Sequence, residues 1–393
     1  MINKQFPLAL TFTLFLTSAL TGCSDEDFLT TQSDETKVLS FSIGTDMEEI
    51  TSKASSEYRA WHSGDPTSFG AFGMYNQSLA DIAKLFNNQQ VTSSVTTVDD
   101  KEVVAWNYDP LKYWVDYTSY KTFDFFGYMP YVAGATLTQG GEGHENEYTL
   151  SYNATLSNAV LSDVANVPLI CKEPVHKTKV GEVINFQMDQ TLTGFSLQFK
   201  LGDKMANIRD FIIKEVKITG AATTLPTAGT VSRTYTYNPS GGTWTAGDIA
   251  WTGVTKNGEA IEYTVPYVNH GVAVAYTDAD AVHGVDGGGT LRIGYSEPAE
   301  TRQWGANFYA IPSAEFTPTI SVKYDVVVVD EDTNDVTTRE NIVSTIQFSN
   351  SYFDTYTAAG AIGQVNPIVV QIVPDYLYVL ADADQRFSYI ILE

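Results

Sequence analysis

Cys23 is the residue whose surroundings point most directly to covalent chemistry. It ends the sequence Leu20-Thr-Gly-Cys, which closes a mostly apolar run of 15 residues (6–20) that follows the basic residue Lys4. Such a run is shorter than the ~20 residues of a membrane-spanning helix, but it suits the apolar part of a cleaved secretory signal. Cleavage between Gly22 and Cys23 would leave a thiol at the new N-terminus.

The residues around this cleavage point resemble the bacterial lipobox. In that motif the cysteine is the acylated nucleophile, and small residues precede it. The resemblance implies a signal peptide over residues 1–22 and a covalent lipid on Cys23, while an ordinary secretory signal with an incidental cysteine is the alternative. Residues 24–27 are Ser-Asp-Glu-Asp, which resembles the signal that sends Bacteroidota lipoproteins to the outside of the outer membrane. A solvated acidic tether over residues 23–37 is the simpler interpretation of the same run.

The other polar residues form no recognisable catalytic or metal-binding pattern. None of the five histidines is spaced as H-x-H or H-x-x-x-H, and no G-x-S-x-G motif occurs. The acidic clusters at 330–332 and 382–384 lack the twelve-residue pattern of a calcium loop, so solvated turns are favoured there. Cys171 has no cysteine partner after acylation of Cys23, and we interpret it as a buried thiol. We expect no catalytic residue, no metal and no cofactor besides the lipid.

The composition favours an all-β protein and argues against polyanionic partners. Aromatic residues make up 12% of the 393 residues and charged residues only 18%, a mixture typical of strands. The 47 acidic and 23 basic residues give a formal net charge of −24. Nucleic acid and anionic lipid head groups are therefore poor partners. After the signal no apolar run reaches membrane-spanning length, so we expect membrane attachment through the lipid alone.

The first strand is predicted at residues 38–44, where apolar and polar residues alternate with period two. The apolar face carries Leu39, Phe41 and Ile43. An exposed loop over residues 45–66 follows and contains Lys53 and Arg59. A trypsin-like protease acting at either residue would free the first strand without cutting a core strand.

Further along the chain, many short alternating segments predict β-sandwiches. Residues 78–86 are the exception, because Ser78 and Asp81 resemble a capping box and predict a helix. Residues 223–248 predict a hairpin with a long exposed loop. We place a boundary at the basic, proline-containing segment 171–181, which gives an N-terminal sandwich over 38–178 and a C-terminal sandwich over 179–393.

Two aromatic blocks are the most distinctive part of the sequence. Trp106–Trp114 reads W-x-Y-x-P-x-x-Y-W and Phe123–Pro130 reads F-x-F-F-x-Y-x-P, which we interpret as core strands meeting at prolines. Together with an Ile-Pro strand at 307–312 and an alternating strand at 320–325, they resemble the fimbrillin (Mfa-like) family of Bacteroidota surface lipoproteins. The resemblance implies two tandem Greek-key (transthyretin-like) sandwiches and a non-enzymatic subunit of pili or adhesins. Many relatives carry a Trp near the C-terminus, and this chain ends without one.

The resemblance also implies assembly by donor-strand exchange with other fimbrial subunits or copies of this chain. The candidate donor is the C-terminal segment, where Phe387, Tyr389 and Ile391 alternate like the first strand. The alternative is a non-polymerising tip or accessory protein whose first strand stays in place.

Two other functions are open at this stage. A carbohydrate-binding outer-membrane lipoprotein would stack sugars on exposed aromatics, and Trp244 and Trp251 are the candidates because they lie in the loop-rich part of the chain. A glycosidase that uses two distant carboxylates is a third hypothesis. The leading hypothesis is a surface-exposed lipoprotein of the outer membrane or of a fimbrium, with a host or bacterial surface ligand as a further partner.

Overall fold

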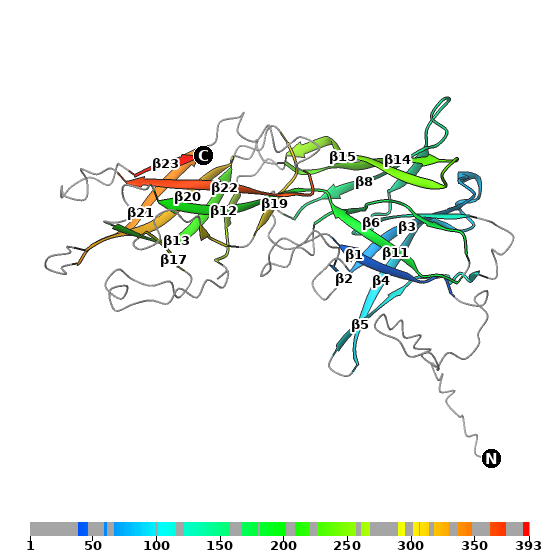
Figure 1. Ribbon diagram of the computed structural model, residues 1–393, viewed down its shortest axis with the longest axis horizontal. Helices are drawn as coiled ribbons and strands as arrows, with labels where there is room; N and C mark the ends of the chain where they lie inside the picture. Colours follow the sequence, from blue (N-terminus) through cyan, green and yellow to red (C-terminus); the bar gives the residue numbers. More distant parts are fainter. Residues whose placement is uncertain are drawn as a thin grey trace, which may run out of the picture. The chain divides into compact units, whose positions relative to one another are not determined.

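The computed structural model describes residues 38–45, 59–60, 67–98, 101–114, 122–157, 167–179, 181–201, 209–220, 226–256, 261–267, 290–294, 302–305, 307–313, 318–329, 336–347, 362–374 and 388–392. Regular structure in these residues is β-strand, apart from one short 3-10 helix, η2 (Leu79–Asp81). The all-β prediction is therefore confirmed (Figure 1). The division into tandem domains and their Greek-key connections stay predictions.

The described strands form four sheets. The nine-stranded sheet has the order β2-β1-β11-β9-β6-β3-β4-β5, with β10 also paired to β6. Its strands are β1 (Phe41–Thr45), β2 (Arg59–Ala60), β3 (Ser68–Tyr75), β4 (Phe86–Val98), β5 (Lys101–Asn107), β6 (Phe123–Met129), β9 (Leu169–Cys171), β10 (Val175–Lys177) and β11 (Ile184–Gln190). The four-stranded sheet, in the order β15-β14-β8-β7, consists of β7 (Thr136–Gln139), β8 (Glu147–Thr155), β14 (Pro226–Asn238) and β15 (Thr243–Lys256).

The other two sheets have five strands each. One has the order β18-β12-β22-β23, with β19 also paired to β12, and the other has the order β16-β13-β20-β21, with β17 also paired to β13. Their strands are β12 (Thr193–Leu201), β13 (Arg209–Gly220), β16 (Ile261–Thr264), β17 (Leu291–Gly294), β18 (Arg302–Gln303), β19 (Phe308–Ala310), β20 (Thr319–Val329), β21 (Val336–Gln347), β22 (Val365–Pro374) and β23 (Ser388–Leu392).

The nine-stranded and four-stranded sheets share one hydrophobic core, which is rich in aromatic side chains. Tyr128 of β6 stacks on Tyr152 of β8 with ring centroids 4.6 Å apart. Phe126 of β6 makes edge contacts with Tyr235 of β14 at 5.5 Å and with Trp244 of β15 at 5.3 Å. Interleaved rings from facing sheets define a sandwich. The two aromatic blocks of the sequence contribute Trp114 and most of β6 to this core.

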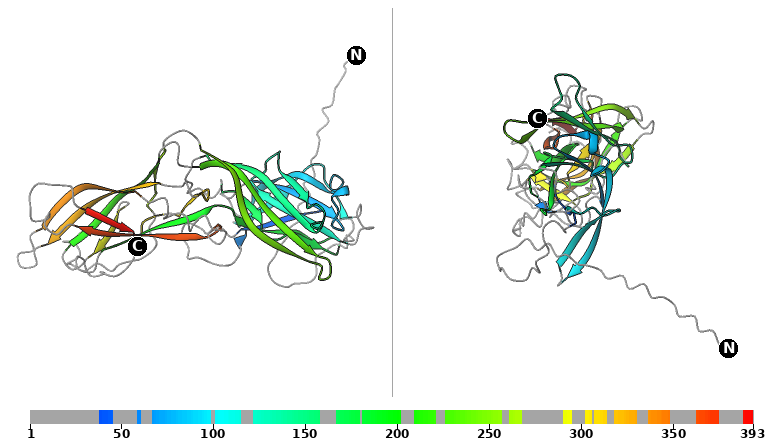
Figure 2. Two further views of the ribbon diagram at one scale, coloured as in Figure 1. Left: turned by 90° about the horizontal axis from the view of Figure 1, so that it is seen from above. Right: turned by 90° about the vertical axis from the view of Figure 1, so that its right-hand side faces the viewer.

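The two five-stranded sheets share a second core with a more aliphatic lining. Its buried side chains include Leu197, Phe211, Ile213, Val216, Ile218, Ile320, Val322, Ile368 and Val370. In β12 and the first half of β20 these residues alternate with polar neighbours, which is the pattern that the sequence showed. Figure 2 shows these strands and the long β14–β15 hairpin from two further directions.

The predicted helix at 78–86 is wrong. Ser78 does cap a helical turn, since its Oγ accepts a hydrogen bond from the Ala80 N–H at 3.3 Å. The turn ends after η2, and Phe86 begins β4 instead, paired opposite Gly73 of β3. Leu85 and Phe86 are both buried in the aromatic core. From Phe86 onward the backbone pairs with β3 and does not continue the helix.

Sheet pairing crosses the predicted boundary between 178 and 179. β11 lies beyond it, yet pairs with β1 and β9 of the nine-stranded sheet. Segment 171–181 looked like a linker because of its charges and proline, but it contains the last residue of β9 and all of β10. The predicted hairpin near 223–248 is confirmed as β14–β15, whereas its long loop is wrong, because only residues 239–242 separate the strands.

Candidate strand-exchange site

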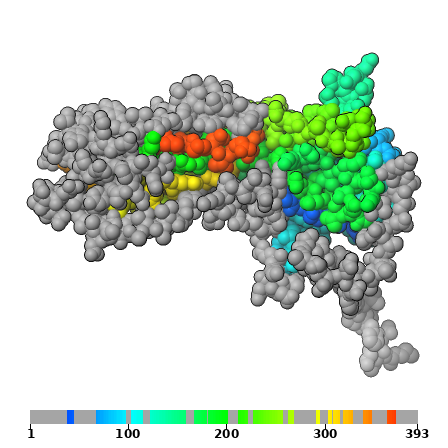
Figure 3. Space-filling view, in the orientation of Figure 1, coloured from blue at the N-terminus to red at the C-terminus, as the bar shows by residue number. Residues whose placement is uncertain are grey.

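β1 lies next to the margin of the nine-stranded sheet. On one side it pairs in parallel with β11 over five residues, from Phe41 opposite Ile184 to Thr45 opposite Met188. On the other side, among the described strands, β2 pairs with only its last two residues. Among the described residues, most of β1 therefore pairs with a strand on one side only. In Figure 3 a narrow strip of β1 (blue) is visible beside β11 (green).

The apolar face of β1 is buried as the sequence predicted. Leu39, Phe41 and Ile43 are 0%, 6% and 5% exposed. Phe41 occupies an aromatic pocket, and its ring centroid lies 5.3 to 6.0 Å from those of Phe69, Phe86, Tyr108 and Phe186. These rings come from β3, β4, the segment after β5, and β11. We call this pocket, together with the margin of β11 that pairs with β1, the β1 slot.

Residues 108–114, here called the strap, hold the N-terminal end of β1. Val38 forms an isolated β-bridge with Tyr113, and the Leu39 N–H donates to the Lys112 carbonyl oxygen at 2.9 Å. The Tyr108 hydroxyl donates to the Leu39 carbonyl oxygen at 2.8 Å. The strap is the second half of the first aromatic block, which the sequence predicted as a strand. Only the start of that block lies in β5, and the rest is irregular.

The structure separates the other predicted site residues. Arg59 was expected in an exposed loop, but it lies in β2, opposite Thr45 of β1. Tyr389 and Ile391, the candidate donor residues, lie in β23, which pairs antiparallel with β22 of another sheet. Gly22, Cys23, Lys53 and Phe387 lie outside the described residues. Acylation, processing and donation therefore stay predictions.

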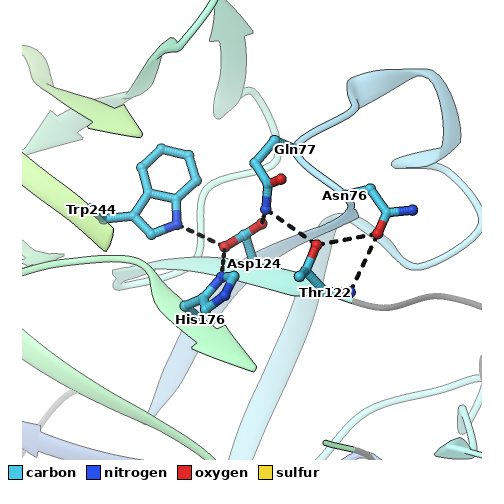
Figure 4. Close-up of polar contacts among 6 residues, drawn as sticks. All are labelled: Asn76, Gln77, Thr122, Asp124, His176 and Trp244. Atoms are coloured by element: carbon cyan, nitrogen blue, oxygen red, sulfur yellow. Dashed lines mark hydrogen bonds and ion pairs between the residues drawn. The ribbon is translucent and has the colours of Figure 1, made fainter. Parts of the chain in front are cut away.

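A buried carboxylate that the sequence analysis missed lies on β6 (Figure 4). Asp124 is 0% exposed, and its Oδ1 lies 2.7 Å from His176 Nδ1 on β10. The same oxygen accepts a 2.7 Å hydrogen bond from the Trp244 indole N–H on β15, while Oδ2 accepts from the Gln77 amide at 2.5 Å. We call these four residues the Asp124 cluster. It joins the nine-stranded sheet to the four-stranded sheet.

The network extends from Gln77 to the end of β6. Gln77 also donates to Thr122 Oγ1, whose hydroxyl and backbone N–H both contact the Asn76 side-chain oxygen. Asn76 and Gln77 have positive φ angles of 44° and 56°. Residues other than glycine adopt this backbone conformation at an energetic cost. The hydrogen bond from His176 to Asp124 raises the pKa of the imidazole. The cluster therefore favours an ion pair between strands over a solvent-exposed catalytic dyad.

The two tryptophans considered for sugar binding are not on a loop. Trp244 is 6% exposed, and its indole N–H is bound by Asp124. Trp251, also on β15, is partly buried, and its indole N–H donates to the Thr191 carbonyl oxygen at 2.7 Å. Their rings pack against the aromatic core. The carbohydrate-binding alternative stays a hypothesis, but Trp244 and Trp251, which the sequence suggested for stacking on sugars, pack within the fold instead.

Cys171 is buried, as predicted. Its Sγ lies 3.1 Å from the Tyr235 hydroxyl, and burial raises the pKa of the thiol to about 11. Within the described part of the chain, no three metal-ligating side chains come together, and no helix is long and apolar enough to cross a membrane.

Comparison with known proteins gives similarity to solved structures only. No family model matches the chain, and no curated protein sequence matches it. The chain is similar to a fimbrial protein from Bacteroides vulgatus, with 14% identity, 90% of this chain and 97% of that chain covered, and a TM-score of 0.41. It is also similar to a candidate cell adhesion protein from Bacteroides ovatus, with 13% identity, 91% and 96% coverage, and a TM-score of 0.34.

A second fimbrial protein, from Bacteroides ovatus, has 13% identity, covers 86% of this chain and 49% of that chain, and gives a TM-score of 0.24. The fimbrillin resemblance and these structures name the same class of protein. Because every TM-score is below 0.5, the function has to be argued from the chain itself.

Proposed function

We propose that this protein is a non-enzymatic surface lipoprotein that serves as a fimbrial subunit or adhesin and exchanges strands with neighbouring subunits. The observation that carries the proposal is the position of β1, a short strand that is deeply buried on one face but, in the part of the chain that the structure describes, is paired over most of its length on one side only. The lipobox-like sequence ending at Cys23 supports anchoring in the outer membrane. An adhesin of this kind would also contact a ligand on a host or bacterial surface.

Loss of β1 would leave a slot that has to be refilled. Leu39, just before the strand, and Phe41 and Ile43 within it are each worth ~1.5–3 kcal/mol, so together they contribute roughly 5–9 kcal/mol of apolar contact. Removal would also expose the unpaired margin of β11. A strand supplied by another subunit would restore both the side-chain contacts and the ladder hydrogen bonds, which is the general mode of strand addition to an open edge.

The C-terminal strand is our proposed donor. In β23 the residues Tyr389 and Ile391 are separated by one residue, as Phe41 and Ile43 are in β1. β23 is the last strand in the order of its sheet and pairs with β22 over five residues. Donation would therefore break one ladder and leave the interior of that sheet paired.

Limited proteolysis tests the assembly. Trypsin treatment of the purified chain, with cleavage after Lys53 or Arg59, should give SDS-resistant ladders as slots are refilled between copies. A chain that lacks residues 387–393 should be cleaved equally but should stay monomeric, because it has no donor. Cleaved wild-type protein that remains monomeric with β1 still bound would reject strand exchange.

Fractionation of cells tests the anchoring. The Cys23→Ala variant should leave the outer-membrane fraction, whereas the matched variant Cys171→Ala, which removes the other thiol, should remain there. External protease should digest the wild-type protein on intact cells. Retention of Cys23→Ala in the membrane, or full protection of the wild type, would contradict a surface lipoprotein.

A further inference from the structure

The strap contacts β1 at a point that strand pairing with β11 does not reach. Pairing with β11 begins at Phe41, whereas the strap holds the two residues at 38 and 39. Both polar groups of the Leu39 residue are bound there, the N–H by Lys112 and the carbonyl oxygen by the Tyr108 hydroxyl. Leu39 itself is fully buried. A buried carbonyl group that loses its partner costs ~1–3 kcal/mol, so the Tyr108 hydroxyl is a strong local contact.

The strap has its own anchors in the core. The Trp114 ring is fully buried and lies 5.2 Å from the ring of Phe123 on β6. At the other end, the Tyr108 ring lies 5.3 Å from Phe86 on β4, in an edge-to-face arrangement. In between, the Lys112 ammonium group donates to the Lys84 carbonyl oxygen at 2.8 Å. These anchors do not belong to β1, so the Tyr108 side chain has contacts that position it besides its ring contact with Phe41.

We propose that Tyr108 is the positioning residue of the β1 slot, and that its hydroxyl both retains the strand in the slot and fixes the strand's register. Register matters because a slip by one residue would turn the apolar face of the strand away from the pocket. Leu39 lies two residues before Phe41, the aromatic residue that fills the pocket. The Tyr108 hydroxyl therefore fixes where the backbone carbonyl group of that earlier residue must lie. The same requirement applies to an incoming strand, which is where the inference rests on the proposed strand exchange.

Two conservative variants separate this role from general stability. Tyr108→Phe keeps the ring in its contacts with Phe41 and Phe86 and removes only the hydroxyl. Tyr152→Phe is the matched control, because the Tyr152 hydroxyl makes the same kind of bond, to the Leu169 carbonyl oxygen at 2.9 Å, in the same aromatic core. Tyr108→Phe also removes a longer bond within the strap, which the Lys112 backbone N–H donates to the hydroxyl at 3.4 Å. Of the two variants, only Tyr108→Phe loses a bond to Leu39, just before β1.

The first measurement is the rate at which the cleaved N-terminal fragment leaves. Full-length protein is cut with trypsin, and the fragment that contains β1 is followed by size exclusion and mass spectrometry. Tyr108→Phe should release it roughly 5- to 30-fold faster than the wild type, as expected from the loss of one buried hydrogen bond. Tyr152→Phe should release it at the wild-type rate. Equal release from Tyr108→Phe and the wild type, or equal acceleration by both variants, would overturn the proposal.

Hydrogen exchange on the uncut chain gives a second test that does not depend on cleavage or assembly. The Leu39 amide should exchange faster in Tyr108→Phe and unchanged in Tyr152→Phe, and unchanged exchange in both would overturn the proposal. The proposed role of Tyr108 and the proposed strand exchange can also be rejected independently of each other. Faster release without ladders would reject strand exchange and keep the role of Tyr108, whereas ladders with unaltered release would do the reverse.

Discussion

β1 and β6 are both buried strands of the nine-stranded sheet, but different kinds of contact hold them in place. β6 pairs with β3 on one side and with β9 and β10 on the other, and its Asp124 carboxylate binds side chains from three other segments. β1 is held by apolar side chains, one parallel ladder with β11, a two-residue pairing with β2 and the strap. Under the proposed strand exchange, another alternating strand would reproduce the contacts of β1, whereas the Asp124 carboxylate binds three specific side chains. This difference is the reason why our proposal assigns strand exchange to β1 and not to β6.

Removal of the Asp124 carboxylate should have the largest effect. Asp124→Ala should lower the free energy of unfolding by about 3–5 kcal/mol, because a buried ion pair loses one member and the Trp244 and Gln77 donors lose their acceptor. Chemical denaturation measures this change. The control is Asp81→Ala, which removes a partly exposed carboxylate 2.6 Å from Lys84 and should cost less than about 1 kcal/mol. Equal effects of the two variants would mean that the cluster does not hold the sheets together.

Truncation of the central side chain of β1 should have the next largest effect. Phe41→Ala should cost about 3 kcal/mol, at the low end for a buried phenylalanine because the pocket lies near the margin of the sheet. Ser42→Ala, on the other face of the same strand, should change stability by less than about 0.5 kcal/mol. Thermal unfolding compares the two. A loss from Phe41→Ala no greater than that from Ser42→Ala would show that the pocket contributes little to holding β1.

The smallest effect is a pH dependence of the Asp124 cluster. The pKa of His176 is raised in the folded protein by its bond to Asp124. Its stabilising contribution is therefore fully present below the unfolded pKa, ~6.5, and is lost as the pH rises through the higher folded value. We expect the stability difference between the wild type and His176→Gln to be larger at pH 5.5 than at pH 8.5. A difference that does not change with pH would contradict an ion pair.

A matched histidine lies on the surface. His144 is 2.8 Å from Glu147, and this bond also raises the pKa of His144. Both side chains are exposed, so water and salt screen the pair. His144→Gln should leave the unfolding midpoint unchanged at both pH values, and a shift as large as that of His176→Gln would mean that burial is not the cause.

The sequence predicts the two regions unequally. Leu39, Phe41 and Ile43 were found from period-two alternation alone, because a local pattern decides which face of a strand is buried. The Asp124 cluster was missed because its partners Gln77, His176 and Trp244 lie 47, 52 and 120 residues away along the chain. The one available signal was a charged residue inside the otherwise apolar block Phe123–Pro130. A polar residue in a strand is usually solvent-exposed, and only the fold shows that this one is not.

The sequence also did not predict which strand pairs with β1. β1 pairs in parallel with β11, which comes after most of the first sandwich and after the predicted boundary. Parallel neighbours need a long crossover, so no turn signal links them in the sequence. The strap was misassigned for a different reason. Its aromatic residues suit a strand, but Tyr108 and Trp114 are buried as anchors at the two ends of an irregular segment.

A reversible lock on β1 tests most directly whether β1 is the exchangeable strand. Ser42 and Asn185 are register partners on β1 and β11, and both lie away from the buried face. Adjacent strands are within the Cα separation that a disulfide allows, so a Ser42→Cys, Asn185→Cys double variant can tie the two strands together. After trypsin cleavage, the oxidised variant should remain monomeric, and the same sample should form SDS-resistant ladders once it is reduced. Ladders of equal extent with the disulfide intact would contradict the account.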